Sequence, residues 1–122
     1  MRIISWNAQG MKKSQVLREV QFLKCVHKPN IMFILETMVN SKNVKTILPN
    51  TGFEHFDYVD PVNHSSGLAI LWNNKTIYPS ILSKEQRAIH LVHNIEKKNV
   101  IVSGVYAPAQ HRENDSFWNH LL

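Results

Sequence analysis

A continuous apolar run, IMFIL at residues 31–35, places the strongest limit on how this chain can fold. Five apolar residues in a row leave no polar face for water, which is typical of a β-strand that is covered on both sides inside an α/β protein. A short strand is also expected at Arg2–Trp6, and a helix is expected over residues 12–27 between the two strands. The order strand, helix, buried strand predicts a βαβ unit whose two strands are parallel neighbours.

The segment between these strands, KKSQVLREVQFLKCVH, carries apolar side chains at three- and four-residue spacing. This spacing predicts an amphipathic helix with one buried stripe, formed by Val16, Leu17, Val20, Leu23 and Val26 or His27. Ser14 is the expected N-cap, and Pro29 is expected to end the segment. Cys25 is assigned to the same stripe and is expected to lie in the core.

The rest of the chain has a different pattern of residues, which predicts mainly short strands. A short helix is expected over Lys42–Leu48, stopped by Pro49 and Gly52. Five short segments rich in β-branched and aromatic residues then predict an antiparallel meander: Phe53–Val59, Gly67–Asn73, Ile77–Ser83, Ala88–Ile95 and Val100–Tyr106. The last segment, RENDSFWNHLL, has the pattern of the first turns of a helix without a C-cap. The whole predicts a mixed α/β (α+β) fold in which residues 1–122 form a single, incomplete domain.

Composition and charge exclude several classes of protein. The single cysteine excludes an internal disulfide, and no apolar segment is long enough to span a bilayer. With no leader-like segment at the start, we expect an intracellular protein, nuclear or cytoplasmic, that does not enter a membrane. The net charge of +5 is compatible with binding a polyanion such as nucleic acid, although many basic proteins bind none.

Two polar residues stand where the first two expected strands end. Asn7 follows the first strand and Glu36 follows the second. Because ligands bind beyond the carboxyl ends of parallel strands, an amide beside a carboxylate at this edge is a reasonable half-site for a hard cation. The alternative is that Asn7 begins a turn before Gly10 and that Glu36 is a solvated strand end. The pattern alone favours this alternative, since catalytic residues are rare.

A third candidate follows the last expected strand. Tyr106 precedes the turn at Pro108, where its hydroxyl could be presented to a phosphate at the same sheet edge, with Arg112 in the following polar loop adding positive charge. The alternative is a half-buried strand tyrosine followed by a proline turn, which is commoner for any single tyrosine. Gly67, in HSSGLAILW, is expected to relieve a tight loop that enters a buried strand.

Four motifs occur in an order that matches one known family. ISWNAQG matches S-W-N-x-x-G, and IMFILETM matches a buried strand that ends in glutamate followed by threonine or serine. SSGLAILW resembles S-G-G-L-A-L-L-W, and VYAPAQHRENDSFWNHL resembles V-Y-x-P, a polar loop, and a helix with F-W-x-x-L. Together they resemble the endonuclease/exonuclease/phosphatase family. Within it, the likeness is strongest to the endonuclease domains of plant non-LTR (LINE-type) retrotransposons and their domesticated derivatives.

The resemblance implies a fold, a reaction and residue roles. The fold is a layered sandwich of two β-sheets with helices outside, and the reaction is hydrolysis of phosphoesters with Mg²⁺ (or Mn²⁺), on nucleic acid and on DNA first of all. By motif position, Glu36 would be a metal ligand, and Asn7 would hydrogen-bond around the metal and the scissile phosphate. Tyr106 would contact the phosphate as a third catalytic residue. The expected substrate-binding residues are Ser66, Gly67 and Arg112.

The chain also departs from the family pattern. Gln9 stands where many members have an acidic residue, Leu35 replaces the usual glutamine, and Ser66 replaces the first of two glycines. The later motifs G-D-x-N and S-D-H do not occur. The resemblance therefore implies the N-terminal half of a retroelement-derived endonuclease that is inactive alone. Two alternatives stay open: a nonenzymatic remnant that binds nucleic acid or protein, and a truncated product that folds poorly.

Overall fold

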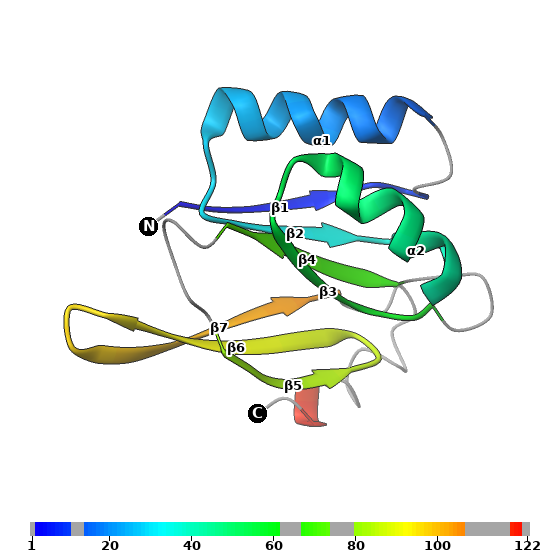
Figure 1. The fold of residues 1–122 in the computed structure, drawn as a ribbon. Helices are drawn as coiled ribbons and strands as arrows, with labels where there is room; N and C mark the ends of the chain where they lie inside the picture. The colour runs from blue at the N-terminus through cyan, green and yellow to red at the C-terminus, as the bar shows by residue number, and fades with distance from the viewer. Residues whose placement is uncertain (1, 11–13, 62–66, 74–79, 107–117, 121–122) are drawn as a thin grey trace.

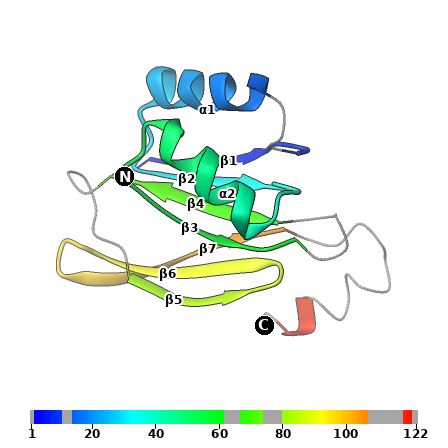
Figure 2. The ribbon, with the colours of Figure 1, turned by 45° about the vertical axis from the view of Figure 1, so that its right-hand side comes forward.

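Two β-sheets lie face to face, and two helices cover the outer side of the larger sheet (Figures 1 and 2). This computed structural model describes residues 2–10, 14–61, 67–73, 80–106 and 118–120. The first sheet has the strand order β1-β2-β4-β3 and the second the order β5-β6-β7. The elements are β1 (Ile3–Asn7), α1 (Ser14–His27), β2 (Ile31–Leu35), α2 (Ser41–Ile47), the 3-10 helix η1 (Leu48–Thr51), β3 (His55–Val59), β4 (Leu68–Trp72), β5 (Ser80–Glu85), β6 (Ala88–Ile95) and β7 (Lys98–Val105).

Strand β2 lies inside the first sheet and is the apolar run that the sequence singled out. It pairs in parallel with β1, from Ile3 opposite Ile31 to Asn7 opposite Leu35, and antiparallel with β4 on its other side. The first four residues of β2 are buried. The prediction of a βαβ unit with a strand covered on both faces is therefore confirmed.

Two hydrophobic cores hold the layers together. Because side chains alternate along a strand, β2 and β4 each contribute to both cores. One core lies between the first sheet and the helices and contains Val16, Val20, Met32, Ile34, Val39, Val44, Leu48, Phe53, Ala69 and Leu71. The other lies between the two sheets and contains Ile31, Phe33, Leu68, Ile70, Ile89 and Leu91.

Helix α1 follows the expected pattern only in part, and residues 12 and 13 lie outside the described residues. Val16 and Val20 are buried, but Val26 is 53% exposed and Cys25 is exposed as well. The assignment of Cys25 to the buried stripe was wrong, because a helix turns about 100° per residue and places residue 25 about 140° from Val20. Phe22, 64% exposed, also faces away from the core.

The expected antiparallel meander is confirmed only in part: β3–β4, β5–β6 and β6–β7 pair antiparallel as predicted, but the five strands do not form one sheet. Strands β3 and β4 pair with each other and join β2 in the first sheet, whereas β5, β6 and β7 form the second sheet. The physical reason lies in β4, whose sequence LAILW is apolar on both faces and is buried over Leu68–Leu71. Such a strand requires a position that is covered on both sides, and β4 finds it beside β2.

Some expected boundaries shift, and others fall outside the described residues. Strand β3 begins at His55 rather than Phe53, and β5 ends at Glu85 rather than Ser83, while residues 77–79 lie outside the described residues. Of the expected C-terminal helix, residues 118–120 are described and are helical. The short helix α2 is confirmed, with the Asn40 side chain as its N-cap. Within the described parts of the chain, no helix is long and apolar enough to cross a membrane.

The two sheets approach each other closely at Gly104 on β7. This residue is buried, and a β-carbon added to it would overlap the ring of Phe33 on β2. The ring of Phe33 therefore occupies the space that a side chain at residue 104 would need. The contact is one of those that fix the position of β7 under β2.

The variant Gly104→Ala is expected to lower the free energy of unfolding by about 1–3 kcal/mol, because the new methyl group overpacks the space between the sheets. Urea denaturation of the variant and of the wild type measures the difference. The double variant Gly104→Ala with Phe33→Leu should lose less than the sum of the two single losses, because the smaller side chain removes the overlap. Strict additivity would show that the two residues do not touch.

Candidate functional site

The edge of the first sheet where β1 and β2 end brings two of the predicted site residues together. Asn7 is the last residue of β1 and pairs with Leu35, and Glu36 follows directly. Beyond the strands the two chain segments stay side by side, because the Ala8 N–H donates to the Leu35 carbonyl (2.9 Å) and the Gly10 N–H donates to the Glu36 carbonyl (2.8 Å). Asn7 is exposed and Glu36 half-buried. Their expected juxtaposition is confirmed, and their chemical roles stay predictions.

Tyr106 joins the second sheet to this edge. It follows β7 directly, and its hydroxyl donates a hydrogen bond to Oε1 of Glu36. Its backbone N–H donates to the Arg87 carbonyl (2.9 Å), and the Arg87 guanidinium carbon lies 5.5 Å from the centre of the tyrosine ring. Tyr106 is thus a half-buried residue at the end of a strand that also contacts the candidate carboxylate.

Gly67 lies at the same edge, and its role is in the backbone conformation of the loop before β4. It immediately precedes β4, has a φ of +94°, and accepts a hydrogen bond through its carbonyl from the Thr37 N–H (3.2 Å). A β-carbon at residue 67 would overlap the hydroxyl of Thr37, which is itself buried. This geometry agrees with the interpretation of a tight loop before a buried strand. Of the other expected substrate-binding residues, Ser66 and Arg112 lie outside the described residues.

The backbone around these residues is strained. Gln9, Glu36 and Met38 have positive φ values of 51°, 54° and 54°, in the left-handed region that favours glycine. Each such residue costs about 1–3 kcal/mol and persists only where the surrounding structure holds it. Here the two chain segments that leave β1 and β2 hold each other through the hydrogen bond from Gly10 to Glu36. Strain of this kind gathers at functional sites, which strengthens the case for this edge.

The site combines three kinds of oxygen atom. They are the carboxylate of Glu36, the hydroxyl of Tyr106 and the side-chain oxygen of Asn7, which accepts a hydrogen bond from the Gln9 N–H (3.1 Å). Mg²⁺ prefers oxygen ligands and is commonly held by one or two carboxylates, waters and substrate phosphates. The donor set therefore fits this cation. Within the described ranges, no group of three or more His, Cys, Asp or Glu residues is placed to hold a metal ion.

The negative charge of this edge acts on Tyr106. The hydrogen bond to Glu36 raises the pKa of the tyrosine hydroxyl above its ordinary value of 10.0. Desolvation and the charge of Glu36 raise this pKa further, and the charge of Arg87 lowers it. Tyr106 is consequently a neutral hydrogen-bond donor at physiological pH.

Two residues of this edge were not found from the sequence. Arg87 lies in the turn between β5 and β6, and Thr37 follows Glu36 and is buried beneath Gly67. Thr37 forms part of the matched motif, in which threonine or serine follows the glutamate, and this was the available signal. Arg87 belongs to no motif, and only the pairing of β6 with β7, which sets its carbonyl against the N–H of Tyr106, brings it here.

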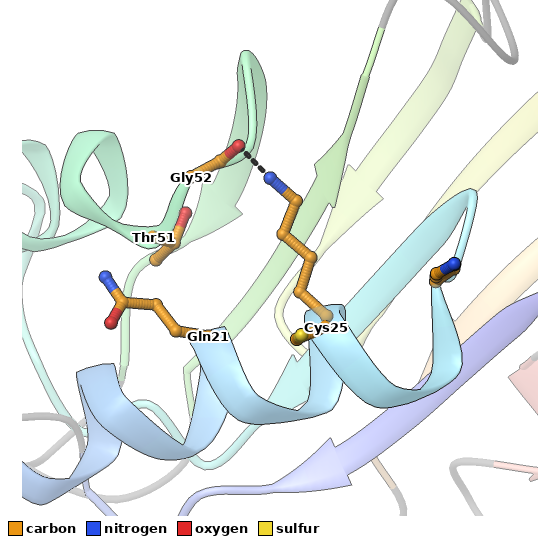
Figure 3. Close-up of a pocket in the computed structure, with 6 residues that line it drawn as sticks. Gln21, Cys25, Thr51 and Gly52 are labelled. Carbon is orange, nitrogen blue, oxygen red and sulfur yellow. Dashed lines mark hydrogen bonds between the residues drawn. The ribbon is translucent and has the colours of Figure 1, made fainter.

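A separate pocket lies on the helix layer, away from this edge (Figure 3). It has a volume of about 390 Å³ and is lined by Gln21, Lys24, Cys25, Lys28, Thr51 and Gly52. The Lys24 ammonium donates to the Gly52 carbonyl, as the dashed line in Figure 3 shows, and lies 5.1 Å from the centre of the Phe53 ring. The Gln21 amide donates to the Asn50 carbonyl (3.0 Å). These contacts tie α1 to the chain around η1.

Solved structures of nucleases and related phosphoesterases share this fold. The 3′ phosphatase NExo from Neisseria, bound to a product DNA hairpin, matches with a TM-score of 0.67 and 17% sequence identity over 99% of this chain and 49% of that chain. The endonuclease domain of TRAS1, a telomere-specific non-LTR retrotransposon, gives 0.66 and 11% over 98% and 51%. The AP endonuclease LMAP from Leishmania major gives 0.63 and 16% over 88% and 40%.

The likeness at these identities shows the fold: the chain has the two-sheet α/β fold of endonuclease/exonuclease/phosphatase proteins. It spans about half the length of these chains or less. No protein-family model matches the chain, and no curated protein matches its sequence.

Tyr106 is expected to lose its proton above pH 10.0, and Glu36→Gln is expected to shift this titration downward because it removes the negative charge beside the hydroxyl. Ultraviolet difference absorbance of tyrosinate, wild type minus Tyr106→Phe, measures the shift. Since folding raises this pKa, the stabilisation is fully present below the unfolded-state pKa and is lost as the pH rises through the folded-state pKa. Glu54→Gln is the control, and a titration unchanged by Glu36→Gln would contradict the assigned cause.

Proposed function

We propose that this chain is part of a Mg²⁺-dependent phosphodiesterase of the endonuclease/exonuclease/phosphatase family, derived from a retroelement and acting on DNA. One observation carries the proposal: the Tyr106 hydroxyl of one sheet meets the Glu36 carboxylate of the other, at the edge where Asn7 ends β1. Because a fold alone does not establish a function, the proposal depends on this group of oxygen atoms and not only on the fold. From the order of the four motifs, we propose that the retroelement belonged to the plant LINE type.

Each residue has a proposed task. Glu36 would ligate Mg²⁺ (or Mn²⁺) through its carboxylate, and Asn7 would orient a water or a phosphate oxygen beside it. Tyr106, held neutral, would turn its one hydroxyl hydrogen bond from Glu36 to a phosphate oxygen of the substrate. The cation would offset the negative charge that develops on the phosphate and the leaving oxygen. Ser66, Gly67 and Arg112 remain the proposed contacts to the nucleic acid.

Binding of Mn²⁺ tests the metal site without any need for activity. Electron paramagnetic resonance of free Mn²⁺ should show one binding site that Mg²⁺ competes for, and Glu36→Gln should weaken it about tenfold or more. The matched control is Glu54→Gln, which removes an exposed carboxylate just before β3. Residue 54 lies at the opposite end of the same sheet, because the neighbouring His55 pairs with Trp72. Equal Mn²⁺ affinity of the two variants would show that Glu36 is not a ligand of the metal ion.

Catalysis by the chain alone is a separate question. The sequence holds neither G-D-x-N nor S-D-H, and residues that act as a unit lose activity together. We therefore expect no nicking of supercoiled plasmid in the presence of Mg²⁺. Robust nicking that Glu36→Gln abolishes would support the phosphodiesterase and contradict the expected need for the later motifs.

The net charge of +5 favours a second candidate function, a nonenzymatic module that binds nucleic acid. Neutralising phosphates with lysine and arginine releases counterions, so the binding constant should fall as salt rises, with a slope of about 0.9 per phosphate contacted on a double-logarithmic plot. Titration of a fluorescent DNA duplex at several salt concentrations measures this slope. Salt-sensitive binding that survives Glu36→Gln and Mn²⁺ removal would favour this module, and a flat salt response would exclude phosphate contacts.

A further inference from the structure

The hydroxyl group of Tyr106 has one hydrogen for two acceptors. In the structure this hydrogen is donated to Oε1 of Glu36, whereas the proposed function requires it at a phosphate oxygen of the substrate. A tyrosine hydroxyl carries a single hydrogen, so the two hydrogen bonds exclude each other. Whatever weakens the bond to Glu36 therefore helps Tyr106 to bind the phosphate.

The ring of Tyr106 is held independently of this bond. Its backbone N–H donates to the Arg87 carbonyl (2.9 Å), and the Arg87 guanidinium carbon lies 5.5 Å from the centre of the ring. Two positions earlier, Gly104 packs on the ring of Phe33 and fixes the end of β7 under β2. Rotation about the bond between the ring and the hydroxyl oxygen moves the hydrogen while the ring stays in place. The hydrogen can thus change its acceptor without a rearrangement of either sheet.

The backbone of Glu36 is also held without help from Tyr106. Glu36 has a φ of 54°, and its carbonyl accepts a hydrogen bond from the Gly10 N–H (2.8 Å). The next residue, Thr37, donates its N–H to the Gly67 carbonyl (3.2 Å). These contacts bring the carboxylate to the edge of the first sheet. The hydrogen bond from Tyr106 is consequently free to act on the charge of the carboxylate rather than on its location.

The hydroxyl hydrogen of Tyr106 and a cation would use the same negative charge. A hydrogen bond to a carboxylate is charge-assisted, and so it depends on that charge. The hydrogen carries a partial positive charge, which repels a cation bound to the same carboxylate. The bond from Tyr106 therefore weakens the binding of a cation by Glu36. The effect is reciprocal, so Oε1 of Glu36 becomes a poorer acceptor once the carboxylate binds a cation.

We infer that the hydrogen bond between Tyr106 and Glu36 is a switch that makes phosphate binding depend on the cation. The inference rests on the proposed function, because it assigns an order of events to the same site. Without a cation, the full charge of Glu36 retains the hydroxyl hydrogen of Tyr106. When Glu36 ligates Mg²⁺, Tyr106 releases this bond and donates to a phosphate oxygen. The order keeps a phosphate from binding beside a carboxylate whose negative charge would repel it.

Binding of Mn²⁺ in the absence of nucleic acid tests the switch through its effect on the metal. Electron paramagnetic resonance of free Mn²⁺ should show that Tyr106→Phe binds the ion about three- to tenfold more tightly than the wild type, because the competing hydrogen bond is removed. In a Glu36→Gln background, the same change should leave the weakened affinity as it is. A tyrosine that only orients the carboxylate would give the opposite sign, since its loss weakens metal binding.

The matched control is Tyr58→Phe, which removes the same oxygen atom from another half-buried tyrosine. Tyr58 lies on β3 and packs against the helix core, on the other face of the first sheet. This variant should bind Mn²⁺ as the wild type does. Far-ultraviolet circular dichroism of all variants checks that each is folded.

Binding of a fluorescent DNA duplex at constant ionic strength tests the link to phosphate. Mg²⁺ should strengthen duplex binding, and this gain should be about three- to tenfold smaller in Tyr106→Phe than in the wild type and in Tyr58→Phe. Comparing the gains removes the attraction between the cation and the phosphates, which all three proteins share. An equal gain in all three, or no binding of the duplex by any of them, would overturn the link.

The Mn²⁺ measurement separates failure of the switch from failure of the proposed function. If the wild type binds Mn²⁺ and Tyr106→Phe binds it equally or more weakly, the switch is overturned and the metal site stands. If neither protein binds Mn²⁺, both the switch and the metal site are overturned. Binding by Tyr106→Phe alone would support the switch in its strongest form, in which the hydroxyl excludes the ion.

Discussion

The burial of β2 on both faces is the constraint on which the rest of this structure depends. A strand with no polar face requires a layer on each side, and the chain supplies α1 and α2 on one and β5–β7 on the other. The two layers arise from opposite demands of the same five residues: Met32 and Ile34 point to the helices, and Ile31 and Phe33 point to the second sheet. The sandwich is thus a consequence of one apolar run.

The same strand positions the candidate site. Glu36 leaves β2 in a left-handed conformation, and the segments from β1 and β4 hold it there through hydrogen bonds of Gly10 and Gly67 to its neighbourhood. Tyr106 reaches the carboxylate only because β7 lies beneath β2. The site therefore combines segments from both sheets, and its geometry is a property of the layered fold rather than of any single motif.

Much of this arrangement follows from sequence, and the rest does not for physical reasons. The βαβ unit, the burial of residues 31–34 and the meeting of Asn7 with Glu36 were predicted, because hydrophobic pattern and the rule for parallel strands are local information. The division of the later strands between two sheets was not predicted, since hairpin patterning shows which strands follow each other and not which strand a given edge will choose. The contacts of Tyr106 with Arg87 and Glu36 depend on that choice. The prediction for Cys25 was wrong for a different reason: the predicted buried stripe of α1 was wider than the helical repeat of about 100° per residue allows.

The absence of a side chain at Gly104 has an effect beyond packing. Only Val105 separates it from Tyr106, so the spacing of the layers at Phe33 sets how far the tyrosine hydroxyl must reach to meet its carboxylate. A β-carbon at residue 104 would push the layers apart and draw the hydroxyl away from Glu36 without altering either residue. The distance between the two sheets at Gly104 therefore determines whether the hydrogen bond between Tyr106 and Glu36 can form. A residue in the hydrophobic interior thereby affects the polar contact at the edge of the sheet.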